Sequence, residues 1–381
     1  MKYSTYWAIR MINTIEVNTH GLTYPVLVGE ELEAALADLL KRASRGNCCF
    51  LIFDANFYAL HGQRLVASLR KTRLRYTEFV VPSGEKTKSD IVLSGIYDFL
   101  LGERISRDDL IVAVGGGVTS DLVGYAASTV LRGVNWAVVP TTLLGMVDAA
   151  IGGKTGINHR QGKNLIGAFW QPLFVCCDVR FLMTLSERQI VAGLGEVLKC
   201  AGLSGLPEIA MLSGFVRDGD LYDSKALTHL VHFSAEYKAD VVSKDERDTS
   251  RRLVLNYGHT FAHGIEKALG YGKLLHGEAV IIGIDAALAL GERCGYRIRG
   301  LTAYRTLVGT MMGLLPKRKI DPARVIDAMA LDKKRLSGEQ RFVLLRRIGS
   351  PVVETNVKPA LVAAAIDEAI SRYREYGDSH A

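Results

Sequence analysis

The chain has 381 residues, of which 48% are apolar and 23% charged, a balance typical of a globular protein with a sizeable core. We expect no membrane span, because no run of about 18 apolar residues occurs, and no signal peptide, because the N-terminus lacks an apolar core with a cleavage site. The net charge of +7 favours a basic surface or a basic pocket for an anionic ligand. Without a dense Lys/Arg run interleaved with aromatic residues, a nucleic-acid partner is not expected.

The six cysteines favour a reducing compartment, and we expect the chain to be cytoplasmic. Four of them form adjacent pairs, Cys48–Cys49 and Cys176–Cys177, inside the apolar strands NCCFLIFD and FVCCDV. Cysteines in such strands behave as small buried hydrophobic residues. No CxxC pattern occurs, so a thiolate zinc site is not expected.

The first half of the chain alternates β-rich apolar runs with amphipathic stretches. Such alternation is typical of a doubly wound, mostly parallel sheet with helices on both faces. Strands are predicted at residues 14–17, 25–28, 49–54, 76–81, 110–114 and 136–140, and helices at about 30–44, 63–72, 87–103 and 118–130.

The second half, from about residue 186, is dominated by segments with helical periodicity. Helices are predicted at 186–203, 224–243, 256–270, 276–294, 301–313, 322–335 and 357–374, with one short strand at 342–345. We therefore divide the chain into an α/β domain, residues 1–183, and an all-α domain, residues 184–381.

A glycine-rich turn, Gly115–Gly117, stands between a buried strand and a helix. Glycines at such a turn let backbone N–H groups approach a pyrophosphate, and the helix dipole favours its negative charge. The pattern is not GxGxxG, so a tight structural turn is the alternative. Because Asp121 follows closely, we favour phosphate binding. The segment 83–88, SGEKTK, and Asp54 at a strand end are further candidates for the same nucleotide, since a carboxylate there can hold a ribose hydroxyl.

Residues 139–172 carry many polar groups among glycines. Lysines in glycine-rich backbone suit phosphate or carboxylate binding, whereas a solvated loop with ordinary surface lysines is the alternative. Apolar flanks make a fully exposed loop less favourable. The polar residues of this segment that we single out are Asp148, Lys154, Lys163 and Asn164.

Glu196 and Lys199 lie three apart on an otherwise apolar predicted helix. A surface ion pair is the commonest explanation of that spacing. Apolar neighbours favour burial instead, and a buried carboxylate needs a cation or a metal.

Three histidines, His259, His263 and His276, lie within eighteen residues. Together with a carboxylate from elsewhere, they make a metal site plausible. Spacing alone does not choose between His259 with His263, which share a helix face, and His259 with His276. The segment leading into them adds four polar candidates, Lys238, Asp248, Arg252 and Asn256.

Several strings resemble the 3-dehydroquinate synthase family, in register from about Asp54 to Gly349. They are, in chain order, GEKTKS, GGGVTSDLVGYAAS, RGV, VPTTLL, GGKTGIN, GKNLIGAFWQP, GEVLK, DER, LNYGHTFAH, LHGEAV and DKK. The resemblance implies an NAD-binding α/β domain, an α-helical domain with one divalent metal, Zn²⁺ or Co²⁺, and a homodimer. It also implies an anionic substrate, 3-deoxy-D-arabino-heptulosonate 7-phosphate. This would become 3-dehydroquinate and phosphate through transient oxidation by NAD⁺, phosphate elimination, reduction and aldol cyclisation.

The resemblance also implies roles for individual residues. The metal ligands would be Glu196, His259 and His276, and His263 would handle protons. The other catalytic residues would be Lys154, Asn164, Lys199 and Asp148. Substrate would be bound by Lys163, Lys238, Asp248, Arg252, Asn256, one of Lys333 and Lys334, and Arg132 from a partner subunit. NAD would be bound by Asp54, Glu85, Lys88, Gly116, Gly117, Val118, Asp121, Thr141, Thr142, Lys154, Lys163 and Thr184.

The chain departs from the family pattern at four positions. Ala149 and Ala150 stand where the family usually has serines, Val130 where it has tyrosine, and Asp248 where it has glutamate. Each change removes a polar contact or shortens a side chain. Another sugar-phosphate cyclase, making aminodehydroquinate, 2-deoxy-scyllo-inosose or an epi-valiolone, is therefore an alternative. A metal-dependent NAD polyol dehydrogenase is a further one, although such enzymes lack the lysine-rich GGKT…GKN segment.

Overall fold

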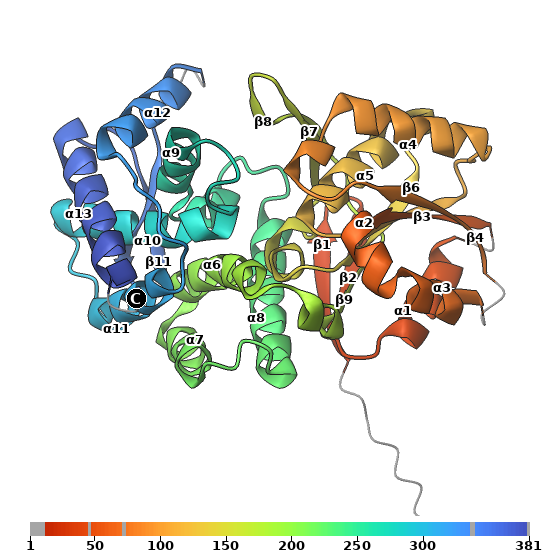
Figure 1. Ribbon diagram of the computed structural model, residues 1–381, viewed down its shortest axis with the longest axis horizontal. Coiled ribbons are helices and arrows are strands. Elements are labelled where there is room, and N and C mark those ends of the chain that lie inside the picture. The colour runs from red at the N-terminus through yellow and green to blue at the C-terminus, as the bar shows by residue number, and fades with distance from the viewer. Residues whose placement is uncertain (1–11, 45–46, 71–73, 336–339, 379–381) are drawn as a thin grey trace, which may run out of the picture. The chain divides into compact units, whose positions relative to one another are not determined.

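The structure is a computed structural model that describes residues 12–44, 47–70, 74–335 and 340–378. The chain forms two compact units (Figure 1). Unit 1 comprises Met1–Thr141 and Gly153–Thr184, and unit 2 comprises Thr142–Gly152 and Leu185–Ala381. The sequence was divided once, between 183 and 184. The structure differs in the segment Thr142–Gly152, which belongs to unit 2. Thr142 and Asp148, two of the predicted site residues, therefore belong to unit 2 as well.

Unit 1 is built on a seven-stranded sheet in the order β1-β2-β9-β6-β5-β3-β4. Only β1 runs antiparallel to its neighbour β2, and the other pairings are parallel. The strands are β1 (Asn13–Thr19), β2 (Leu22–Gly29), β3 (Cys48–Asp54), β4 (Arg75–Val81), β5 (Leu110–Gly115), β6 (Asn135–Pro140) and β9 (Val175–Asp178). The mostly parallel sheet expected from the sequence is confirmed.

Helices cover both faces of this sheet, because successive residues of a strand point to opposite sides. Leu51 and Phe53 share a buried cluster with apolar residues of α1 (Glu33–Ala43) and α3 (Gln63–Arg70). Phe50 instead contacts Phe99 of α4 (Asp90–Gly102), with ring centroids 6.0 Å apart. Further elements are α5 (Gly117–Thr129), α2 (Ala55–Phe57) and the short turns η1 (Tyr58–Gly62), η2 (Glu85–Thr87), η3 (Val130–Arg132) and η5 (Val179–Thr184). The arrangement is doubly wound (Figure 1).

The strand order reverses at β3. The chain passes from β3 to β4 on one side, whereas it passes from the adjacent β5 to β6 on the other, so the connections after β3 and β5 leave in opposite directions. In open α/β sheets, ligands bind in the crevice that such a reversal leaves at the carboxyl ends of the strands. Asp54 ends β3 and Gly115 ends β5, and a Cβ added at Gly115 would lie only 2.9 Å from the Cβ of Asp54. The residues predicted to contact a nucleotide therefore include both borders of this crevice.

A hairpin of β7 (Lys154–His159) and β8 (Gly162–Phe169) packs on α5, where the sequence predicted no strand. Gly156 and Gly167 face each other across it. A Cβ at either position would lie within 2.5 Å of a carbonyl oxygen on the opposite strand, 2.5 Å for Gly156 and 2.1 Å for Gly167. Glycines in this segment are typical of a loop, but here a close contact between the two strand backbones requires them.

Unit 2 is mainly helical, as expected. Its long helices are α6 (Glu187–Ser204), α7 (Leu206–Asp218), α8 (Ser224–Lys244), α9 (His259–Leu269), α10 (His276–Arg293), α11 (Leu301–Gly313), α12 (Pro322–Arg335) and α13 (Pro359–Asp378). Two short helical turns, η4 (Gly145–Ala149) and η6 (Arg251–Asn256), and a hairpin of β10 (Phe342–Arg347) and β11 (Ser350–Glu354) complete it. Most of α10 is buried, against α6, α9, α11 and α13.

The unit differs from the all-α expectation in three details. The strand predicted at 342–345 has a partner, β11, so the unit contains a small antiparallel sheet. α7 was not predicted. The helix predicted at 256–270 begins instead at His259, because Tyr257 has an extended ψ of 122° and Gly258 has a left-handed φ of 79°.

No helix among the described residues is long and apolar enough to cross a bilayer. The cysteines are free thiols; four are buried, and Cys48 and Cys294 are half-buried.

Candidate metal centre and active site

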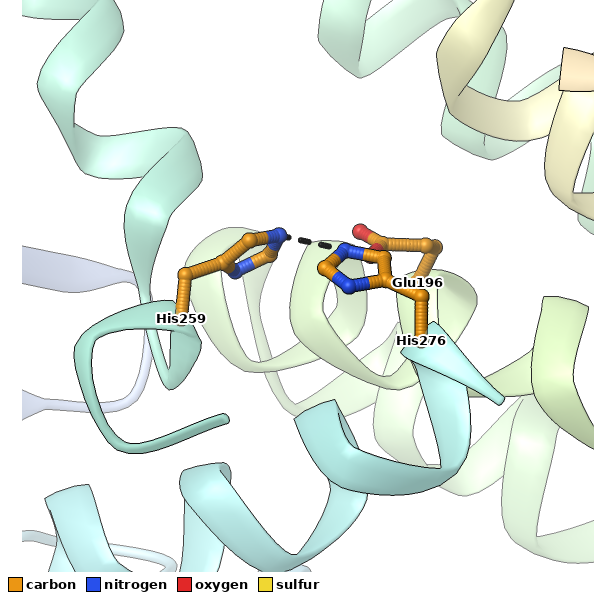
Figure 2. Close-up of side chains that lie close together, drawn as sticks. All are labelled: Glu196, His259 and His276. Carbon is orange, nitrogen blue, oxygen red and sulfur yellow. Dashed lines mark ion pairs between the residues drawn. The ribbon is translucent and has the colours of Figure 1, made fainter. Parts of the chain in front are cut away.

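Three side chains from three helices of unit 2 converge on one point (Figure 2). Glu196 comes from the middle of α6, and His259 and His276 open α9 and α10. The Glu196 side chain is 0% exposed, and its Oε1 lies 3.4 Å from Nε2 of His259 and 3.5 Å from Nε2 of His276. One ligand atom from each residue lies within 4.8 Å of the other two. A single divalent cation can bridge groups at this spacing.

Glycines let the three helices approach closely enough for this convergence. A Cβ at Gly277 would lie 1.7 Å from the carbonyl oxygen of Ala192 on α6, and one at Gly195 would lie 2.3 Å from the carbonyl oxygen of Gly277. A Cβ at Gly283 of α10 would lie 2.2 Å from the carbonyl oxygen of Gly258, which precedes α9. Gly195, Gly258 and Gly277 each adjoin one of the converging residues. The convergence thus depends on backbone-to-backbone contact.

The hydrogen bonds of the two rings suit a cation. Nδ1 of His259 lies 3.1 Å from the carbonyl oxygen of Tyr257, and Nδ1 of His276 lies 3.0 Å from Oε2 of Glu266. Since these oxygens only accept hydrogen bonds, each Nδ1 donates, and in a neutral ring Nε2 keeps its lone pair. Both lone pairs then face the Glu196 carboxylate, an arrangement that needs a positive charge in the middle.

The environment of Glu196 also favours a cation. Within the described part of the chain, neither Glu196 oxygen accepts a well-aligned hydrogen bond, although Nζ of Lys199 lies 2.6 Å from Oε2. Burial would lower the pKa of His276, but the neighbouring Glu196 and Glu266 carboxylates raise it to about 10. The same point therefore attracts positive charge strongly, and a divalent cation fits its donor set.

His263 lies beside this set and is exposed. Its ring centroid is 5.8 Å from the ring centroids of both His259 and His276. The geometry therefore favours His259 with His276, rather than the HxxxH pair, as the partners of Glu196. His263 also forms a second group with Glu266 and His276, whose potential ligand atoms lie within 4.8 Å of one another.

Buried cations surround Asp148 of η4. Nζ of Lys238 donates to the Asp148 carboxylate and, at 2.6 Å, to its carbonyl oxygen, and Nζ of Lys199 lies 3.7 Å from Oδ1. Burial would raise the pKa of Asp148, but the two lysines lower it to about 2. Burial lowers the pKa of Lys238 to about 8, because Arg252 and Lys199 add to the effect and Asp148 offsets only part of it. Such a cluster favours an anionic partner.

Arg252 is 2% exposed and is held by main-chain atoms on two sides. Its guanidinium donates to the carbonyl oxygens of Gly152, at 3.0 Å, and Glu246, at 2.6 Å. Its backbone N–H donates to Oδ2 of Asp245, which also accepts from Ser250, while Oδ1 accepts from Thr249. In the sequence, Asp245 is only the first residue of the string DER, and no local pattern indicates its role.

The remaining predicted residues of this segment lie close in sequence. Asp248 has a left-handed φ of 59°, and Asn256, at the end of η6, is half-buried. Lys333 and Lys334 lie in α12, and their side chains fall outside the described part of the structure.

In unit 1, the glycine turn leads directly into α5. Gly116 is the N-cap of that helix, no side chain in the described part of the chain caps it, and Gly117 and Val118 are its first residues. Thr141, at the end of β6, donates its backbone N–H to the carbonyl oxygen of Gly115 at 2.9 Å. The helix N-terminus therefore has the backbone donors that an anion requires.

Asp54 lies on the other border of the crevice. Its Oδ1 accepts hydrogen bonds from the backbone of Asn56 and Phe57 and from the hydroxyl of Ser83. These contacts fix the carboxylate at the carboxyl end of β3.

Buried Lys88 connects the helix with the β7–β8 hairpin. Its Nζ lies 2.6 Å from Oδ2 of Asp121 and donates to the side chain of Asn164. Asn158 joins the same network, since it donates to Glu85 at 2.7 Å and accepts from the Asn164 backbone at 3.0 Å. The structure thus brings four predicted residues together. Asn158 was missed, although it ends the string GGKTGIN.

The other predicted residues lie apart from this network. Thr184 contacts Nε2 of His61 at 2.8 Å, a partner that the sequence did not indicate. On the hairpin, Lys154 is exposed and Lys163 half-buried. Thr142 belongs to unit 2, unlike the other candidates for NAD binding, and accepts the backbone N–H of Gly145 at 3.1 Å.

Arg132 is exposed on the tight turn η3. Leu131 and Arg132 have left-handed φ angles of 48° and 65°, and Gly133 follows with 117°. Two consecutive non-glycine residues in this region are strained, and such strain is concentrated at functional sites.

Comparison with known families gives two adjoining matches. The model of the 3-dehydroquinate synthase N-terminal region matches residues 78–192, and that of the C-terminal region matches residues 193–335. The chain belongs to the 3-dehydroquinate synthase family. It is 40% identical over 357 residues to a 3-dehydroquinate synthase of Microcystis aeruginosa, a match that covers 91% of this chain and 96% of that relative.

Two solved structures share this fold. A 2-deoxy-scyllo-inosose synthase complexed with carbaglucose-6-phosphate, NAD⁺ and Co²⁺ superposes with a TM-score of 0.85 at 24% identity, covering 93% of this chain and 100% of that one. A 2-epi-5-epi-valiolone synthase from Streptomyces hygroscopicus, with NAD⁺ and Zn²⁺ bound, gives 0.84 at 28% identity, covering 93% and 98%. The first likeness concerns the fold alone.

Proposed function

We propose that this chain is a 3-dehydroquinate synthase. It would convert 3-deoxy-D-arabino-heptulosonate 7-phosphate into 3-dehydroquinate and inorganic phosphate, as a carbon–oxygen lyase with no net redox change. The observation that carries the proposal is the convergence of buried Glu196, buried His259 and half-buried His276, next to the buried Lys199, in a member of this family.

Two cofactors belong to the proposal, and the cofactors of the solved neighbours support both. NAD⁺, when bound, would supply the acceptor for the hydride that leaves the carbon bearing one substrate hydroxyl, while that hydroxyl loses its proton, and the same hydride would be returned later. A divalent cation, Zn²⁺ or Co²⁺, supplies Lewis acidity at that hydroxyl when bound. Glu196, His259 and His276 would hold the cation. NAD would be held by Asp54, Glu85, Lys88, Gly116, Gly117, Val118, Asp121, Thr141, Thr142, Lys154, Lys163 and Thr184.

The substrate carries a carboxylate and a dianionic phosphate, so it needs several fixed cations. Asp148 holds Lys238 and the backbone of Gly152 holds Arg252, and these contacts support a role for both cations in binding the substrate. The proposed substrate-binding residues are Lys163, Lys238, Asp248, Arg252, Asn256, one of Lys333 and Lys334, and Arg132. Lys154, Asn164, Lys199 and Asp148 would orient the reacting hydroxyl and phosphate.

His263 is the proposed proton-transfer group. It is exposed, so a proton can exchange with solvent, and it lies one helical turn from His259 on the same face of α9. A neutral imidazole at this place would move a proton to or from the substrate during ring opening and elimination.

The decisive assay uses the purified protein with NAD⁺ and Zn²⁺ or Co²⁺. We expect phosphate release from the heptulosonate phosphate together with formation of dehydroquinate. Lys238→Met should abolish most of this activity, whereas Lys225→Met, at an exposed position on the same helix, should retain it. Activity on a different seven-carbon phosphate, or net accumulation of NADH with a polyol, would contradict the proposal.

We propose further that the enzyme is a cytoplasmic homodimer in which Arg132 completes the partner's substrate site. The free cysteines support a reducing compartment, and the exposed, strained turn that presents Arg132 supports an intermolecular role. Arg132→Ala and His263→Ala should each be nearly inactive, but the two mixed and allowed to exchange subunits should regain about a quarter of wild-type activity. If the mixture stays inactive although mixed dimers form, Arg132 acts within its own chain.

A further inference from the structure

A buried carboxylate stands behind one of the proposed cation ligands. Glu266 is 4% exposed, and its Oε2 lies 3.0 Å from Nδ1 of His276. The opposite nitrogen of the same ring, Nε2, lies 3.5 Å from Oε1 of Glu196. The His276 ring is therefore held between two carboxylates, one on each side.

This contact fixes which nitrogen of His276 is available. An ionised carboxylate only accepts hydrogen bonds, so Nδ1 must carry the proton. Nε2 then presents its lone pair towards Glu196 and His259. Carboxylate partners of this kind also make a ligating imidazole more basic and fix its orientation.

The second histidine lacks this support. Nδ1 of His259 faces the neutral carbonyl oxygen of Tyr257 at 3.1 Å. Both rings are therefore oriented through Nδ1, but the acceptor is a charged group at His276 and a neutral one at His259. The affinity of His276 for a cation should depend on that charge, whereas the affinity of His259 should not.

The position of Glu266 follows from the geometry of α9. His259, His263 and Glu266 are spaced by four and three residues, which places them on one helix face. Glu266 also buries its charge, which is costly unless a partner compensates for it. A role towards His276 explains why a carboxylate occupies this buried position.

We propose that Glu266 is a positioning residue for the metal centre, holding His276 in the tautomer and orientation that bind a divalent cation. The proposal rests on the proposed function in one respect, namely that Glu196, His259 and His276 bind the cation. Glu266 itself would not touch the cation or the substrate.

The test measures metal binding, without reference to turnover. Zn²⁺ affinity is determined by competition with a chromophoric chelator, and the visible spectrum of the Co²⁺ form reports ligand geometry. We expect Glu266→Ala to weaken Zn²⁺ binding about 10–100-fold and to alter the Co²⁺ bands. Glu266→Gln keeps an oxygen for the Nδ1–H group, so it should lose less affinity than Glu266→Ala.

The matched control is Asp285→Asn. Asp285 is a carboxylate on α10, 1% exposed, that pairs with Arg372 of α13. This variant should lower the melting temperature while leaving the Zn²⁺ affinity and the Co²⁺ spectrum unchanged. If both Glu266 variants also lower the melting temperature without changing the Zn²⁺ affinity or the Co²⁺ spectrum, the Glu266 carboxylate is purely structural and the proposal is wrong.

Two other results are distinguishable. If the wild type binds two equivalents of metal and Glu266→Ala loses only the second, then Glu266 is a ligand with His263 and His276, and the positioning role is wrong. If Glu196→Ala binds Zn²⁺ as tightly as the wild type, the proposed metal centre itself has failed, whatever the Glu266 variants do.

Discussion

The candidate site of unit 1 is formed mainly by backbone groups, whereas that of unit 2 is formed by charged side chains. In unit 1, the candidate site lies at strand ends and at the N-terminus of α5, where Gly116 and Gly117 adjoin the crevice that the strand order creates. In unit 2, the site consists of buried charged side chains from separate helices, among them Glu196, Lys199 and Lys238. A backbone site tolerates the loss of one side chain, whereas a network of buried charges does not.

The largest effect should follow from removing a proposed metal ligand. Glu196→Ala or His276→Ala should lose bound metal and reduce turnover by about 10³-fold or more, because several kcal/mol of charge stabilisation disappear. Metal content by elemental analysis and phosphate release measure the two effects. If either variant retains its metal, the buried charges of unit 2 tolerate the loss of one side chain, and the contrast with unit 1 is wrong.

His263→Ala should separate proton transfer from metal binding. We expect full metal content but a rate about 10²–10⁴-fold lower, the usual contribution of a positioned acid or base. His229→Ala, an exposed histidine on α8, is the control and should be normal in both respects. Metal loss equal to that of Glu196→Ala would instead place His263 among the ligands.

Asp54→Asn tests the side-chain share of the nucleotide site in unit 1. Asparagine keeps the oxygen that accepts from Asn56, Phe57 and Ser83, so the local fold should persist. We expect NAD⁺ affinity to fall only about 10-fold, the loss of one charged hydrogen bond of about 1.5 kcal/mol, with turnover at saturating NAD⁺ retained. A loss as complete as that of Glu196→Ala would remove the contrast between the units.

Asp245→Asn should have the smallest effect on turnover, and its effect on stability should depend on pH in a defined way. Burial would raise the pKa of Asp245, but hydrogen bonds from Arg252, Ser250 and Thr249 lower it well below its ordinary value. Its contribution, about 1.5–3 kcal/mol, should be complete above pH 5 and lost as the pH falls below about 4. Denaturant unfolding of both proteins from pH 7 to pH 3 measures it.

The control for this variant is Asp223→Asn, an exposed carboxylate that accepts from the first backbone N–H groups of α8. It should destabilise the protein less and leave the substrate KM unchanged. Asp245→Asn should raise KM as well, because the turn that it organises also positions Arg252. An equal change in both variants would mean that Asp245 acts only as a helix or turn cap.

The sequence predicted the sheet and most helices because hydrophobic periodicity reports local burial. The prediction was wrong where close backbone contacts, rather than side-chain burial, determine the local structure. The β7–β8 hairpin has mostly exposed or half-buried residues on β8 and close glycine contacts at Gly156 and Gly167, so no alternating pattern marks it. The start of α9 was placed three residues too early, since a single left-handed glycine, Gly258, sets it.

The candidate site was predictable in its residue types but not in its pairings. Spacing along the chain left His263 and His276 equally placed to join His259. The choice depends on how α10 approaches α6, which no local pattern reveals. Asn158 and Asp245 were missed for a related reason: each acts by holding another residue, and the partner is identified only in three dimensions.

The glycine contacts among α6, α9 and α10 have a thermodynamic consequence. Because Gly195, Gly258, Gly277 and Gly283 hold the three backbones in contact, the spacing of Glu196, His259 and His276 is set when unit 2 folds. Cation capture should then require little ordering of the chain. Calorimetry of Zn²⁺ and Co²⁺ binding should accordingly show no large unfavourable conformational entropy, and alanine at Gly277 should introduce one.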